Sequence, residues 1–76
     1  MSDVDHAVDV CGGDATVVRT RIPIWVLEKA RREGASEAQL LAIYPILRAD
    51  DLASAWSYVR SHVEEIDRAI RENEAA

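Results

Sequence analysis

The ten residues VVRTRIPIWV, at positions 17–26, mark a change from extended chain to helix. Ile22 precedes a proline, which biases its backbone away from the helical region, so the chain is expected to be extended up to this point. Pro23 suits the first position of a helix, where its missing N–H is no loss. Thr20 can satisfy a free backbone donor near this helix start. The stretch therefore predicts a joint between a strand and a helix.

A short β-hairpin is predicted immediately before the joint, over residues 8–18. The segments AVDVC and ATVV are strand-like, and Gly12-Gly13 between them is a turn signal. Two short strands alone are marginally stable in water. We therefore expect the hairpin to lie on the helices or to pair with another chain.

Two short helices are predicted after the joint. The first covers residues 23–33, with Gly34 as its C-terminal cap. The second begins at Ser36, where Gln39 completes a capping box, and ends before Pro45. Four apolar residues give the second helix a broad face that we expect to be buried: Leu40, Leu41, Ile43 and Tyr44.

A third, much longer helix is predicted over residues 50–73, a segment that contains neither glycine nor proline. Asp50 and Asp51 lie in its first turn, where negative charge is favourable. At about 1.5 Å per residue the helix would be ~36 Å long, against ~12–17 Å for the other two. The half that starts near His62 is therefore expected to extend beyond them as an arm. An apolar seam of heptad type runs along the whole helix: Leu52, Trp56, Val59, Val63, Ile66 and Ile70.

These elements predict a mainly α fold: a three-helix helix-turn-helix with a short N-terminal β-hairpin and a long third helix that continues as a C-terminal arm. We divide the chain into an N-terminal β element and joint over residues 1–22, a helix-turn-helix core over 23–61 and a helical arm over 62–76. A chain of 76 residues is one domain. At this size it buries only about 60% of its unfolded surface, so a partner or a dimer is expected to add stability.

The composition favours a cytoplasmic protein that does not enter a membrane. Cys11 is the one cysteine and cannot form an internal disulfide, as in a reducing compartment. No apolar run approaches the about 20 residues of a membrane helix, and the acidic start is unlike a signal peptide. The net charge of −5 divides into −4 for residues 1–18, +3 for residues 19–48 and −4 for residues 49–76. A basic middle between acidic ends indicates distinct contact surfaces or ordinary surface charge.

The sequence gives little support for catalysis, so we expect a protein that is not an enzyme and that holds no metal or cofactor. Cys11 has no basic neighbour to activate it and is interpreted as structural. His6 and His62 lack metal-ligand spacing with a cysteine and are interpreted as surface residues. No phosphate-binding glycine loop is present.

A nucleic-acid interface is the first candidate site. Five basic residues are predicted to contact DNA: Arg19, Arg21, Lys29, Arg31 and Arg48. Arg21 serves either as a phosphate contact or as an anchor to an internal carboxylate. The alternative for Lys29 and Arg31, together with Arg32, is that they only solvate the first helix. Asp50 and Asp51, at the start of the presumed reading helix, are unfavourable beside phosphates.

The arm is the second candidate site, and five of its residues are predicted to bind a partner: Val63, Ile66, Ile70, Glu64 and Asp67. An exposed apolar stripe on a long helix usually marks an interface. The acidic residues beside it would complement a basic nuclease surface. The alternative is that the same seam forms a homodimeric coiled coil.

The order of motifs resembles the bacterial domain-of-unknown-function family 433, whose pattern is roughly GGKPVIxGTRIPV, a helix, a segment G-S-x-E-x-I-x-x-x-YP-x-L and a further helix. The match covers residues 10–59. The chain differs where the family has Lys-Pro, a glycine and a small polar cap, and carries Asp14-Ala15, Arg19 and Arg48 instead. Matching residues are Gly12-Gly13, Thr20-Arg21-Ile22-Pro23, Gly34, Ser36, Tyr44-Pro45 and Leu47.

The resemblance implies a homeodomain-like helix-turn-helix and an antitoxin similar to VapB. Its expected partners are a cognate PIN-like toxin nuclease of domain-of-unknown-function family 5615, operator DNA and a second copy of the chain. Such an antitoxin inhibits the toxin and represses its own operon as a dimer. The rival class is a protein-interaction or oligomerisation module without DNA binding, which the net charge favours. A third class, an RNA-binding adaptor, is supported only by the arginines.

Overall fold

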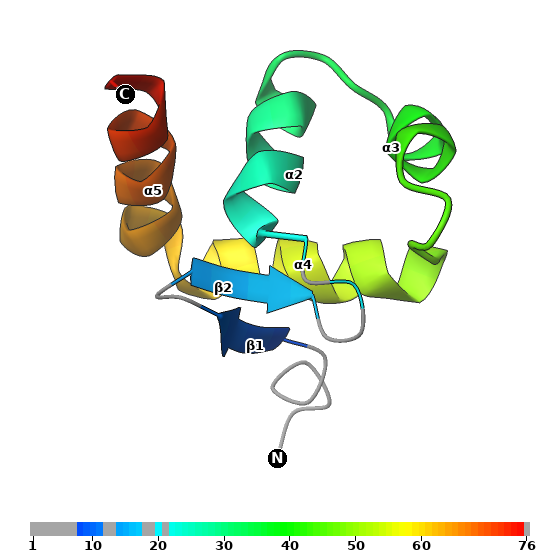
Figure 1. Cartoon of the computed structure of the whole chain (residues 1–76), viewed down its shortest axis with the longest axis horizontal. Coiled ribbons are helices and arrows are strands. Elements are labelled where there is room, and N and C mark those ends of the chain that lie inside the picture. The colour runs from blue at the N-terminus through cyan, green and yellow to red at the C-terminus, as the bar shows by residue number, and fades with distance from the viewer. Residues whose placement is uncertain (1–7, 12–13, 18–19, 21, 76) are drawn as a thin grey trace.

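The computed structural model describes residues 8–11, 14–17, 20 and 22–75. The fold is mainly α, with a two-stranded antiparallel sheet at its N-terminal end (Figure 1). In chain order the elements are β1 (Val8–Cys11), β2 (Asp14–Val17), α2 (Ile24–Arg32), α3 (Glu37–Ile43), α4 (Ala49–Ser61) and α5 (Val63–Ala75).

The predicted hairpin is confirmed. Val8 lies opposite Val17 and Cys11 opposite Asp14, so two residues connect the strands. Those two, Gly12 and Gly13, lie outside the described residues. The sheet is not isolated in the fold, because β2 packs against α2 and its Val17 is fully buried.

The predicted joint is confirmed as well, and Thr20 organises it. Its Oγ1 donates to the carbonyl oxygen of Val17 at 3.1 Å and accepts from the N–H of Ile22 at 3.1 Å. The N–H of Val17 donates to the carbonyl oxygen of Ile22 at 3.0 Å, which closes the turn. Pro23 is the N-cap of α2, with φ −63° and ψ 138°, so the helix begins one residue later than predicted.

The end of α2 and the start of α3 carry the capping features that the sequence predicts. The backbone of Gly34 follows α2 with φ +106°, a conformation that glycine adopts without strain. At the start of α3 the N–H of Gln39 donates to Ser36 Oγ at 3.1 Å, and the N–H of Ser36 donates to Gln39 Oε1 at 2.7 Å. These reciprocal bonds form the predicted capping box.

The prediction of one long third helix with a free arm is wrong. α4 ends at Ser61 and α5 begins at Val63, with His62 between them at φ −135° and ψ 43°. α5 turns back and lies beside α2 (Figure 1). The physical reason is that the seam residues Ile66 and Ile70 find apolar cover on α2 within the same chain, and are 2% and 6% exposed. Folding back removes this apolar stripe from water without a partner.

The core lies where α2 crosses above α4, with α5 on one side and α3 on the other (Figure 1). The indole Nε1 of Trp56, on α4, donates to Glu37 Oε2 on α3 at 3.1 Å and ties the two helices together. Five larger side chains of the core have no exposed surface or almost none: Ile24, Leu27, Leu40, Leu52 and Ile66.

Candidate functional site

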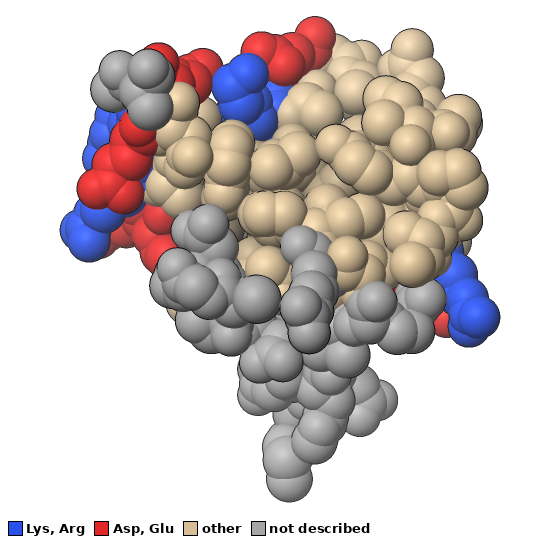
Figure 2. Space-filling model, viewed as in Figure 1, with Lys and Arg blue, Asp and Glu red and all other residues tan. Residues whose placement is uncertain are grey.

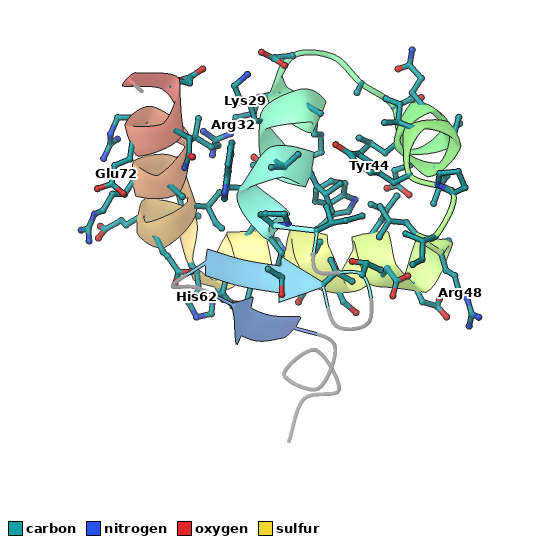
Figure 3. All side chains as sticks on the ribbon, viewed as in Figure 1. Lys29, Arg32, Tyr44, Arg48, His62 and Glu72 are labelled. Atoms are coloured by element: carbon teal, nitrogen blue, oxygen red, sulfur yellow. The ribbon has the colours of Figure 1, made fainter. Side chains whose placement is uncertain are left out.

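The three predicted DNA-binding residues that the structure describes do not form one surface. Lys29 lies near the C-terminal end of α2, whereas Arg48 lies at the start of α4 on the opposite side of the molecule (Figure 3). Lys29 Nζ is 3.1 Å from Glu33 Oε2, one turn along the same helix. Arg48 is exposed, and its backbone N–H donates to Asp51 Oδ2 at 2.8 Å. Arg19 and Arg21 lie outside the described residues.

Arg31 belongs to an internal charge network. Its Nε is 2.8 Å and its Nη2 is 2.6 Å from Oε1 of Glu28, whose carboxylate is buried. The guanidinium carbon of Arg31 also lies 4.3 Å from the centre of the Trp56 ring, a cation–π contact. The carboxylate neutralises much of the positive charge that a phosphate would meet here. For Arg31 the structure therefore supports a role inside the fold.

The same carboxylate links α2 to α5 through Arg32. Arg32 Nε is 2.8 Å from Glu28 Oε2, and its Nη2 is 2.6 Å from Asp67 Oδ1. The hydrogen bond to Glu28, followed by that to Asp67, raises the pKa of Arg32. Sequence reasoning missed Glu28. The signal that could have found it was its position four residues after Ile24, on the apolar face of the helix.

Three of the five predicted partner-binding residues make contacts within this fold. Ile66 and Ile70 are buried against α2, and Asp67 is held by Arg32. Val63 remains 47% exposed, and Glu64 is exposed beside it. Helical periodicity identified the apolar residues correctly, but α2 covers two of the three.

A different apolar surface is exposed at the end of α3. Ile43 is 61% exposed and Ile46, in the following turn, is 52% exposed. Ala42, just before Ile43, and Pro45, just before Ile46, are also exposed. The prediction that Ile43 is buried is therefore wrong. Of the four apolar residues predicted to form a buried face, Leu40 is fully buried, Leu41 and Tyr44 are partly buried, and Ile43 is exposed. We call Ile43, Ile46, Ala42 and Pro45 the isoleucine surface.

The distribution of charge sets this surface apart. In Figure 2 uncharged residues cover the area over α3, whereas mixed positive and negative side chains gather over α5. Neighbouring large apolar side chains that remain exposed to water are typical of surfaces that bind another molecule. The isoleucine surface is therefore the best candidate for contact with another macromolecule.

One shallow cavity lies away from the isoleucine surface. A shallow cavity of about 630 Å³ lies between α2 and α5, where Lys29 and Glu33 already pair with each other. The indole Nε1 of Trp25 in its wall is buried and has no hydrogen-bond partner among the described residues.

Within the described residues no cluster of three or more histidine, cysteine or acidic side chains is arranged for a metal ion. No helix of the described chain is both long and apolar enough to cross a membrane.

Comparison with known proteins places this geometry in a family. The model of a family described as "Protein of unknown function (DUF433)" matches residues 4–59. A crystal structure of a DUF433 member protein from Anabaena variabilis ATCC 29413 is 43% identical over 86% of this chain and 68% of that chain, with a TM-score of 0.81. None of the curated proteins searched matches the chain. The family model covers well over half of the sequence, and the solved relative shares its fold, so the chain belongs to the DUF433 family.

Proposed function

We propose that this protein is a non-enzymatic antitoxin that binds and inhibits a cognate PIN-like ribonuclease of domain-of-unknown-function family 5615. The resemblance of its TRIP and YP motifs to the family supports the class of function. The single observation that carries protein binding is the isoleucine surface, where Ile43 and Ile46 are more than half exposed. In this proposal the toxin contacts α3 and the turn after it rather than α5.

The chemistry of the isoleucine surface suits contact with a nuclease. Burying the exposed part of both isoleucine side chains, a little over half of each, contributes about 2–3 kcal/mol before association costs, at about 1.5–3 kcal/mol for a whole side chain. Glu37 on α3 and Asp50 in the first turn of α4 are exposed on the two helices that the isoleucine surface joins. A ribonuclease needs positive charge to hold RNA, and in this proposal these carboxylates meet that charge.

A pair of matched variants tests this assignment. Ile43→Asp together with Ile46→Asp places charges on the isoleucine surface, whereas Val63→Asp places one on the exposed apolar residue of α5. We expect the first variant to keep its melting temperature and to lose inhibition of the nuclease encoded beside it, while the second keeps inhibition. The measurement is RNA cleavage by the purified nuclease with increasing antitoxin. Loss of inhibition in the Val63 variant alone would return the contact to α5, and failure of the wild-type protein to inhibit would contradict the antitoxin function.

Operator binding is a second candidate function, favoured by the arrangement of α3 and α4. These helices are joined by residues 44–48, and the start of α4 is exposed at its N-cap Arg48 and at Asp50 in its first turn. We propose that they form a homeodomain-like helix-turn-helix that binds DNA as a dimer and represses its own operon. With Asp50 beside the DNA, binding is expected to be weak and sensitive to salt.

Titration of the promoter fragment by gel shift tests operator binding. Arg48→Ala is expected to weaken binding and to reduce the slope of log affinity against log salt by about 0.9 for each phosphate that the variant no longer neutralises. Lys29→Ala is the matched control, because Lys29 is already paired with Glu33 on the other side of the molecule. Absence of a shift at low salt, with and without the nuclease, would favour the rival interaction module without DNA binding.

A further inference from the structure

The bend between α4 and α5 has an unusual origin. A single residue, His62, separates the two helices, with φ −135° and ψ 43°. Sharp bends in helices are almost always found at proline, at glycine–serine pairs, at π-bulges or where a side chain or water inserts into the hydrogen-bond ladder. No glycine or proline follows Pro45 in this sequence. The local sequence is therefore compatible with one continuous helix, and the bend must be held by side chains.

Tyr58 and His62 supply those contacts. At the bend the N–H of His62 donates to the carbonyl oxygen of Val59 at 3.2 Å, so the carbonyl of Tyr58 loses its helical donor. His62 Nδ1 takes that place, at 3.1 Å from the Tyr58 oxygen, and the two rings stack with centroids 3.9 Å apart. The hydroxyl of Tyr58 lies 2.7 Å and 2.9 Å from the two carboxylate oxygens of Glu65 on α5.

A straight helix would replace these side-chain contacts with backbone hydrogen bonds. At the start of α5 the first backbone N–H groups have no partner within the helix, and continuity with α4 would give those of Val63, Glu64 and Glu65 the carbonyls one turn before them. A continuous helix over residues 49–75 would be about 40 Å long, whereas the longest dimension of the folded chain is 30 Å. In that state α5 would project from the body, and the face of α2 that it covers would be open.

We propose that α5 exchanges between two copies of this chain. In the exchanged dimer α4 and α5 join into one helix at His62, and α5 of each copy packs on α2 of the other. Ile66 and Ile70 are buried again, and each Arg32 pairs with Asp67 of the second copy. Exchange of an identical element is a low-cost route to a dimer, because all contacts outside the hinge are the same. It depends on neither the toxin nor DNA.

The hinge residue sets the balance between monomer and exchanged dimer. His62→Ala removes the ring that holds the bend and places the strongest helix former at the hinge, while His62→Gly removes the same ring and disfavours a continuous helix. We expect the dimer dissociation constant of the alanine variant to be at least about tenfold lower than that of the glycine variant, since each dimer contains two hinges. Both proteins are refolded at high concentration, equilibrated at a series of dilutions and measured by light scattering. Equal dissociation constants, or only monomers in both, would overturn the exchange.

A charge-reversal experiment distinguishes exchange from any other dimer. Arg32→Glu and Asp67→Arg each place like charges across the α2–α5 contact. Mixed and refolded in the alanine-hinge background, the two variants regain two opposite-charge pairs only in an exchanged heterodimer. We expect heterodimers to predominate in native mass spectra, well above the half that random pairing gives.

The double variant Arg32→Glu with Asp67→Arg is the reference, because it restores the pair within one chain and shows whether a second carboxylate beside Glu28 is tolerated. The mixture remains informative when a single variant does not fold alone, since the exchanged heterodimer restores both ion pairs. Random pairing, or a mixture with no heterodimer, would overturn the proposal.

Discussion

Replacing Ile66 by alanine is expected to destabilise the protein by about 2–5 kcal/mol, the range for an isoleucine truncated in a core. Ile66 is 2% exposed and lies on α5, where it packs against α2. At about 0.05–0.15 kcal/mol per residue, a chain of 76 residues has a total stability of only ~4–11 kcal/mol. The substitution therefore removes a large share of the free energy of unfolding.

The measurement is urea unfolding at one fixed protein concentration, followed by circular dichroism and by tryptophan fluorescence. Val63→Ala is the matched control on the same helix. Because Val63 is 47% exposed, its truncation is expected to change the free energy of unfolding by less than about 1 kcal/mol. A free arm would make both changes small and similar. An Ile66 effect no larger than the Val63 effect would therefore refute the docking of α5 on α2.

Three further substitutions test other interactions. Glu28→Gln is expected to lower the free energy of unfolding by about 1.5–3 kcal/mol, because it removes the negative charge that accepts hydrogen bonds from Arg31 and Arg32. An unchanged melting temperature would contradict this. Ser36→Ala is expected to lower the urea midpoint by the equivalent of about 0.5–2 kcal/mol because it removes the capping box, with an unchanged slope. Burial, and then the hydrogen bond to Glu65, raises the pKa of Tyr58 to about 12 from its ordinary 10.0. Its contribution is therefore complete below the unfolded pKa and is lost as the pH rises from 10.0 to about 12, so the stability difference between wild type and Tyr58→Phe should shrink across that range.

The sequence by itself determined the local structure. The Gly-Gly pair, the Ile-Pro step and the capping box at Ser36 each act through a few neighbouring residues, and the hairpin, the start of α2 and the start of α3 lie where these signals predict them. Thr20 was likewise predicted to satisfy a backbone donor and does so at Ile22. Such features depend on backbone geometry and short-range hydrogen bonds, which the order of residues specifies directly.

Only the tertiary structure decided the path of the chain after Ser61 and the residues that a partner can reach. The heptad seam identified which residues of α5 are apolar, but a periodic pattern does not say what covers them. Here α2 covers Ile66 and Ile70, and Glu28 and Arg32 join that contact through Asp67. The segment contains neither glycine nor proline, so the bend exists because the contacts of Tyr58 and His62, together with the packing of α5 on α2 of the same chain, outweigh the backbone hydrogen bonds of a straight helix. The same packing hides the predicted stripe on α5, while Ile43 and Ile46 remain in water.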